Sequence, residues 1–62
     1  MNYSKNIKLL REKLLLTQEE FAKLLDVSFS SVNRWERGHY DPTIKVKRKL
    51  RKLFVENGIV EE

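Results

Sequence analysis

Residues 17–38 read TQEEFAKLLDVSFSSVNRWERG, and this stretch predicts two short helices joined by a tight turn. Thr17 precedes the first of them and Glu20 follows three residues later, which is the spacing of a capping box. Ser28 is placed as the N-cap of the second helix, and Gly38 follows that helix in the position of a C-terminal glycine. The stretch therefore predicts helices over about 18–25 and 29–37.

Helical periodicity continues on both sides of this stretch. Before it, Ile7, Leu10 and Leu14 recur at steps of three and four, with Ser4 placed to cap, which predicts a helix over about 5–15. After it, apolar residues follow the same period until an Asn-Gly stop at 57–58, which predicts a helix over about 43–56. No alternating pattern of strand length occurs. The sequence predicts an all-α fold of four helices in a single domain over residues 1–62.

The apolar residues of these periods define the expected core. Each helix lays one apolar face inward and leaves a polar face outside. The apolar pair at 59–60 is not assigned to a helix, and a dimer contact, a fold back onto the core, fraying or a short fifth helix all stay open for it. The residues expected to face inward in the last three helices include Phe21, Leu24, Leu25, Val32, Trp35 and Ile44.

Length and composition limit the possible functions. The chain has 62 residues, no cysteine and one histidine, so we expect neither disulfides nor a metal site nor another cofactor. Its apolar runs are too short to span a bilayer and no secretory signal is visible, so a cytoplasmic protein without a membrane partner is expected. No constellation of nucleophile, base and acid is present, so neither an enzyme nor a small-molecule ligand is expected.

The formal net charge of +4 is unevenly distributed along the chain. Residues 27–55 hold eight basic and two acidic side chains, so the basic field belongs to the second half. Most of the basic residues in the last helix are expected to form a solvated face that attracts an anionic partner over long range. The basic residues of that helix are Lys45, Lys47, Arg48, Lys49, Arg51 and Lys52, and Lys45, which is nearest the preceding loop, is the one expected to touch the partner.

A wider pattern runs from Ile7 to Phe54. Its residues are Leu10, Arg11, Leu16, Thr17, Gln18, Phe21, Ala22, Leu25, Val27, Ser28, Val32, Trp35, Glu36, Arg37, Gly38 and Pro42. With this spacing the chain resembles the phage-repressor and Cro-like helix-turn-helix family, also called the XRE family, whose fold is the compact lambda-repressor-like domain. The resemblance implies a transcriptional regulator, expected to be a repressor, that inserts helix 28–37 into the major groove of double-stranded DNA. A homodimer on a palindromic site is expected if the chain dimerises.

The resemblance places base contacts on the outward face of the second central helix. An arginine there binds guanine O6 and N7 bidentately, an asparagine bridges adenine N6 and N7, and an aromatic ring packs on a thymine methyl group. For the aromatic residue, packing against a neighbouring helix stays open as the alternative. The expected base-contacting residues are Phe29, Ser30, Asn33 and Arg34.

The resemblance also implies contacts to the DNA backbone. Gln18 begins a helix whose free N–H groups favour an anion, and the family uses this glutamine on a phosphate. The loop after the second central helix is expected to lie along the sugar-phosphate backbone, although Tyr40 in that loop has a position over the core as its alternative. The expected phosphate-contacting residues are Gln18, Ser31, Arg37, His39, Tyr40 and Lys45.

The resemblance also implies structural roles for three positions. The family pairs an arginine of its first helix with a glutamate at the end of its third, which implies an ion pair between Arg11 and Glu36. Such a pair fixes orientation if it is half-buried, and it is worth under about 1 kcal/mol if it is exposed. The family usually has glycine in the turn between the central helices, where this chain has Asp26. Asp26 is expected to adopt the left-handed conformation at a cost of about 1 kcal/mol.

A protein-interaction module is the alternative function. An antitoxin or a coactivator-like adaptor would use the basic surface to dock a partner, and bulk charge is enough for that purpose. Base recognition instead requires specific side chains such as those of Asn33 and Arg34. The outward set on the second central helix therefore discriminates between the two hypotheses.

Overall fold

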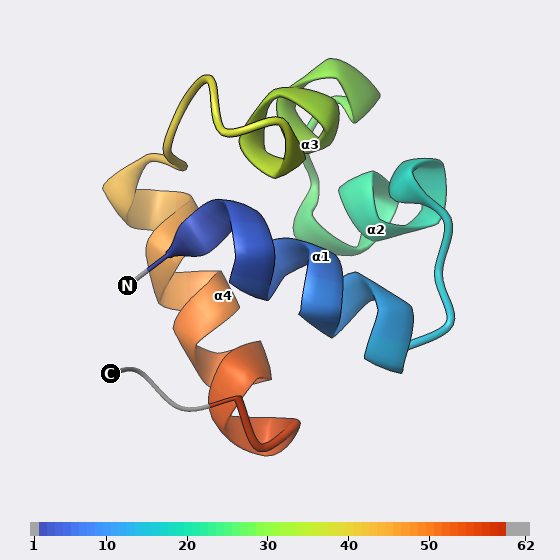
Figure 1. Ribbon diagram of the computed structural model, residues 1–62, viewed down its shortest axis with the longest axis vertical. Coiled ribbons are helices and arrows are strands. Elements are labelled where there is room, and N and C mark those ends of the chain that lie inside the picture. Colours follow the sequence, from blue (N-terminus) through green and yellow to red (C-terminus); the bar gives the residue numbers. More distant parts are fainter. Residues whose placement is uncertain (1, 60–62) are drawn as a thin grey trace.

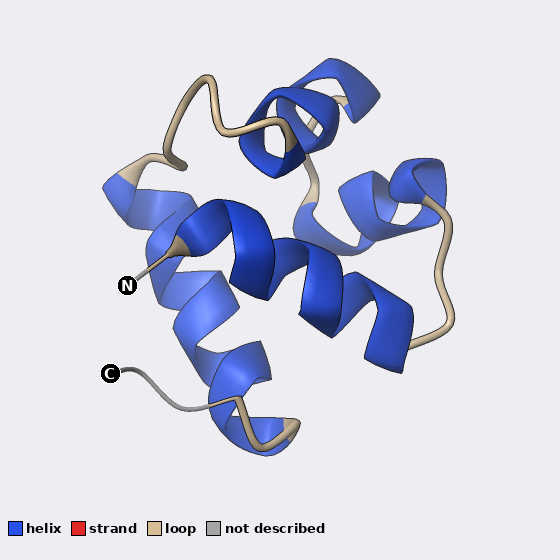
Figure 2. Cartoon of the chain, in the orientation of Figure 1, coloured by secondary structure: helices blue, strands red, loops and turns tan. Residues whose placement is uncertain are grey.

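The computed structural model describes residues 2–59, and in that range it contains helices and loops but no strand (Figure 2). The helices are α1 (Tyr3–Lys13), α2 (Gln18–Leu25), α3 (Phe29–Glu36) and α4 (Ile44–Glu56). In Figure 1, α1 crosses the middle of the molecule, with α2 and α3 on one side and α4 on the other. Helix α1 contacts both α3 and α4, and α2 contacts α3. The all-α prediction is confirmed.

Helix α1 begins earlier than the periodicity predicts. Asn2 is its N-cap, and the Asn2 side-chain oxygen accepts a hydrogen bond from the backbone N–H of Lys5 at 3.1 Å. Ser4, which the sequence suggested as the cap, lies inside the first turn. Its hydroxyl donates to the backbone carbonyl of Glu36 at 2.8 Å and so ties α1 to the end of α3.

All four helices end in the same backbone arrangement. In each case a residue with positive φ donates its N–H to the carbonyl three positions earlier, and the next residue donates to the carbonyl five positions earlier. The expected left-handed conformation of Asp26 is confirmed. The expected end of α1 at residue 15 is wrong, because Leu15 is itself the left-handed residue after that helix. The four residues are Leu15, Asp26, Gly38 and Gly58, with φ of 57°, 58°, 77° and 71°.

We expect Asp26→Gly to raise the melting temperature and to leave DNA affinity unchanged. An L-residue in the left-handed region costs about 1 kcal/mol more than glycine, and a gain of that size corresponds to about 4–8 °C in a domain this small. Leu15→Gly is the matched variant, because the Leu15 side chain is 89% exposed and has little packing to lose. Thermal unfolding followed by circular dichroism measures both, and an unchanged or lower melting point in both would contradict the expected strain.

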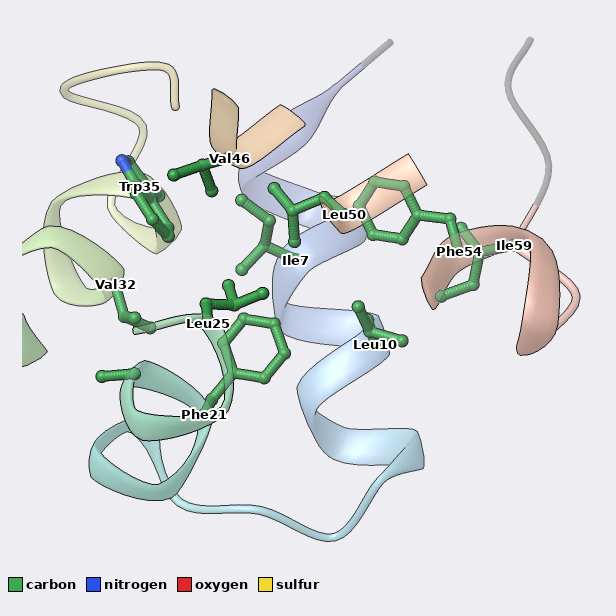
Figure 3. Packing of buried hydrophobic residues seen from close by; sticks show 11 residues of the cluster. Ile7, Leu10, Phe21, Leu25, Val32, Trp35, Val46, Leu50, Phe54 and Ile59 are labelled. Carbon is green, nitrogen blue, oxygen red and sulfur yellow. The ribbon is translucent and has the colours of Figure 1, made fainter. Parts of the chain in front are cut away.

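A single buried cluster joins the four helices. Figure 3 shows Ile7 of α1 in the middle, with Val32 toward one end of the cluster and Phe54 toward the other. The inward pair of α3 is confirmed, since Val32 and Trp35 are 0% and 6% exposed. This pair fixes the rotation of α3 about its axis, so it decides which side chains of α3 face outward.

Two residues expected in the core lie at the surface instead. Leu24 is 52% exposed, because the buried face of the short helix α2 is centred on Phe21, Ala22 and Leu25. Ile44 is 64% exposed at the first position of α4, and the first inward residue of that helix is Val46.

The end of α4 turns back toward the core. The N–H of Ile59 donates to the carbonyl of Phe54 at 2.8 Å, and the Ile59 side chain joins the buried cluster at 6% exposure. Of the possibilities for the apolar pair at 59–60, the fold back onto the core is therefore the one observed for Ile59. Val60 lies outside the described residues, and no fifth helix begins among residues 57–59.

Candidate nucleic-acid interface

The start of α2 is fixed by the predicted capping box, which is present. The N–H of Glu20 donates to Thr17 Oγ1 at 3.1 Å, and the N–H of Thr17 donates to Glu20 Oε1 at 2.9 Å. The hydrogen bond from the Thr17 backbone holds the pKa of Glu20 below its usual range. Both hydrogen bonds join Thr17 to Glu20 across the first turn of the helix, so they fix Gln18 as the first residue of α2.

The start of α3 is fixed in a similar way. The N–H of Ser31 donates to Ser28 Oγ at 3.1 Å, and the two serine hydroxyl oxygens lie 2.9 Å apart. With Val32 and Trp35 buried, the side chains of Phe29 and Ser30 are exposed at the first turn. Phe29 is 47% exposed and lies outside the buried cluster, so about half of its surface is available to a partner.

Glu36, the last residue of α3, is the centre of a hydrogen-bonded network. Arg11 donates from Nε to Glu36 Oε2 at 2.7 Å and from Nη2 to Oε1 at 2.9 Å. The two side chains are only 17% and 6% exposed, so this ion pair is largely buried. The side-chain hydrogen bond to Glu36 raises the pKa of Arg11. Arg11 also donates from Nη1 to the carbonyl of Leu16 at 3.1 Å, which ties the loop before α2 to the same pair.

The network extends from Glu36 to the outer face of α3. Gln18 donates from Nε2 to Glu36 Oε1 at 3.1 Å, and it accepts at Oε1 from Asn33 Nδ2 at 3.3 Å. The structure therefore brings together an expected phosphate-contacting residue and an expected base-contacting residue. Both side chains are half-buried. This contact could not be predicted from the sequence, because neither the helical period of α2 nor that of α3 relates positions on two different helices.

Arg34 is the exposed cation on the outer face of α3. Its guanidinium carbon lies 5.6 Å from the centre of the Tyr40 ring, which is within the range of a cation–π contact. Tyr40 is 62% exposed, so it does not lie over the core as its alternative placement required. Arg37, His39 and Lys45 are exposed on the segment that runs from the end of α3 into α4.

Two of the basic residues of α4 have partners within the molecule. Lys49 Nζ donates to the carbonyl of Leu25 at 3.0 Å and so binds the end of α2. Lys47 Nζ lies 4.8 Å from the centre of the Tyr3 ring. Neither residue is a simple member of a solvated face, whereas Arg48, Arg51 and Lys52 are exposed.

The outer face of α3 thus combines a guanidinium, a carboxamide, a hydroxyl and an aromatic ring. These are groups that recognise base edges in a major groove. Among residues 2–59, no three histidine, aspartate or glutamate side chains are grouped as a metal site would require. No helix in that range is long and apolar enough to cross a membrane.

Known proteins with similar sequences are also helix-turn-helix proteins. The helix-turn-helix family model matches residues 7–54. An uncharacterised HTH-type transcriptional regulator of Methanocaldococcus jannaschii is 46% identical over 39 residues, which cover 63% of this chain and 59% of that protein. An uncharacterised HTH-type transcriptional regulator of Archaeoglobus fulgidus is 38% identical over 56 residues, which cover 90% of this chain and 76% of that protein. No solved structure gives a significant match.

Proposed function

Because the chain belongs to the helix-turn-helix family of Cro/C1 type, we propose that it is a sequence-specific DNA-binding transcriptional regulator, a repressor, that inserts α3 into the major groove. The observation that supports this most strongly is the outer face of α3. It carries polar side chains suited to base edges, while Val32 and Trp35 hold the opposite face in the core. The family is one of non-enzymatic proteins, and the proposed function includes no catalytic step.

The proposed base contacts divide by chemistry. Arg34 donates twice to guanine O6 and N7, and Asn33 bridges adenine N6 and N7. Phe29 packs on a thymine methyl group, and Ser30 donates to a base or a phosphate. The contact of Arg34 with the Tyr40 ring supports this assignment, because it restricts the guanidinium before DNA is bound.

The proposed phosphate contacts surround α3. Gln18 and Ser31 lie in the first turns of α2 and α3, where free backbone N–H groups and the helix dipole favour an anion. The remaining contacts come from the exposed segment after α3. Phosphate contacts of this kind fix the position of the protein on the duplex before bases are distinguished. In the segment after α3, the residues proposed to contact phosphate are Arg37, His39, Tyr40 and Lys45.

Selection of duplexes from a randomised pool, followed by affinity measurements over a range of salt concentrations, tests the proposed function. We expect one motif to be enriched, and we expect the logarithm of its association constant to fall linearly with the logarithm of salt concentration by about 0.9 per phosphate neutralised. Equal affinity for every duplex would contradict sequence-specific recognition. It would favour an adaptor that uses only the bulk charge of the basic surface.

We also propose that the chain binds a palindromic site as a homodimer. Two-fold dimers of helix-turn-helix proteins place their recognition helices about 34 Å apart, one turn of DNA. The selected motif should then contain two inverted half-sites. Sedimentation of the complex should give two chains per duplex, and a single chain on a motif without symmetry would contradict the dimer.

A further inference from the structure

We propose that Glu36, acting through Gln18, fixes which end of the Asn33 carboxamide faces DNA, so that this position of α3 selects adenine over guanine. Glu36 and Gln18 are then positioning residues for base preference, in addition to their contacts within the fold. The inference rests on the proposed function, since it concerns the orientation of a side chain that contacts a base.

The orientation is set first at Gln18. A carboxylate only accepts hydrogen bonds, so the group of Gln18 that meets Glu36 has to be its NH₂. The distance from Gln18 Nε2 to Glu36 Oε1 is 3.1 Å. Glu36 itself is held by two hydrogen bonds from Arg11 and is 6% exposed, so it offers a fixed acceptor.

The orientation of the Gln18 carboxamide then fixes that of the Asn33 carboxamide. With its NH₂ directed at Glu36, Gln18 presents its carbonyl oxygen to α3. An oxygen acceptor requires a donor, and Asn33 meets it with Nδ2 at a distance of 3.3 Å. The charge of Glu36 therefore determines the direction of both carboxamides.

The free groups of Asn33 then match one purine. Once one N–H of Nδ2 is engaged by Gln18, Asn33 retains Oδ1 as an acceptor and its second N–H as a donor. Adenine presents a donor at N6 and an acceptor at N7, which this pair satisfies. Guanine presents acceptors at both O6 and N7, so an Asn33 oxygen held toward the base has no donor to meet, whereas a carboxamide that is free to turn can direct its NH₂ at either atom. Holding Asn33 in one orientation therefore favours adenine.

The test compares base preferences, using duplexes selected by the wild type. Asn33→Ala identifies the base pair that Asn33 contacts. Gln18→Met keeps the length of the side chain and removes both hydrogen-bonding groups. Because a bidentate contact distinguishes bases by about 5- to 150-fold, we expect Gln18→Met to reduce the preference for adenine over guanine at that pair by at least about fivefold. The double variant, Gln18→Met with Asn33→Ala, should lose no more of the preference for adenine than either single variant, since the two side chains act as one coupled unit.

A control separates this effect from a lost phosphate contact. Lys45→Ala removes a proposed phosphate contact at an exposed residue outside the network, so it should weaken binding evenly for all sequences. Melting temperatures establish that the variants are folded, and Gln18→Ala replaces Gln18→Met if the latter is not. An even loss of affinity in the Gln18 variant, with the adenine preference intact, would overturn the inference and leave the proposed function standing. Absence of any selected motif for the wild type would overturn both.

Discussion

Glu36→Ala should lower the free energy of unfolding by about 3–5 kcal/mol. Removal of the carboxylate leaves Arg11 as a largely buried charge without its partner, and losses of this size are typical of a broken buried pair. Gln18 loses an acceptor at the same time. The total stability of a 62-residue chain is only about 3–9 kcal/mol, so a loss of this size removes a third or more of it and should lower the melting temperature markedly.

Chemical denaturation measures this loss, with Glu56→Ala as the matched control. Glu56 is exposed at the end of α4, and its replacement should change the stability by no more than about 0.5 kcal/mol. A double replacement, Arg11→Met with Glu36→Met, should recover much of the loss, because an apolar pair leaves no buried charge unpaired. Equal stabilities for Glu36→Ala and Glu56→Ala would show that the Arg11–Glu36 pair contributes little to the fold.

Arg34→Ala should reduce the preference for guanine at one base pair of the selected motif by about 1–3 kcal/mol. A bidentate arginine–guanine contact supplies discrimination of that size, and its removal leaves the other base pairs unaffected. The stability of the fold should change little, because the Arg34 side chain is exposed. Competition between the selected duplex and single-base variants of it measures the effect.

Arg51→Ala is the matched control for this prediction. Arg51 is an exposed arginine of α4, so its replacement removes the same charge without touching α3. We expect a small, sequence-independent loss of affinity. Lys49→Ala would be a poorer control, because Lys49 binds the carbonyl of Leu25 and its loss disturbs the end of α2. Equal losses of sequence preference in the Arg34 and Arg51 variants would contradict a base contact by Arg34.

The parts of the fold that could be predicted depend on local chemistry. The capping box at Thr17 and the inward pair Val32 and Trp35 follow from spacings within a single helix, and the structure contains both. The end of α1 was predicted wrongly because the left-handed residue there is Leu15. A leucine gives no sequence signal for a helix end, since glycine usually occupies such a position.

The candidate site was predictable to a smaller extent. The outer face of α3 follows from helical periodicity, but the Gln18–Asn33 contact joins two helices and depends on the angle between them. The exposure of Ile44 and Leu24 has a related origin, because hydrophobicity alone does not show where a short apolar face ends. Contacts that depend on the packing of separate helices required the structure.

Replacement of guanines in the selected duplex by 7-deazaguanine tests most directly whether α3 binds in the major groove. This analogue keeps Watson–Crick pairing and the minor groove intact and lacks the N7 acceptor that faces the major groove. At one guanine, the analogue should weaken binding of the wild type and have no effect on Arg34→Ala. Unchanged binding of the wild type at every guanine, or an equal loss in both proteins, would contradict the contact between Arg34 and the major groove.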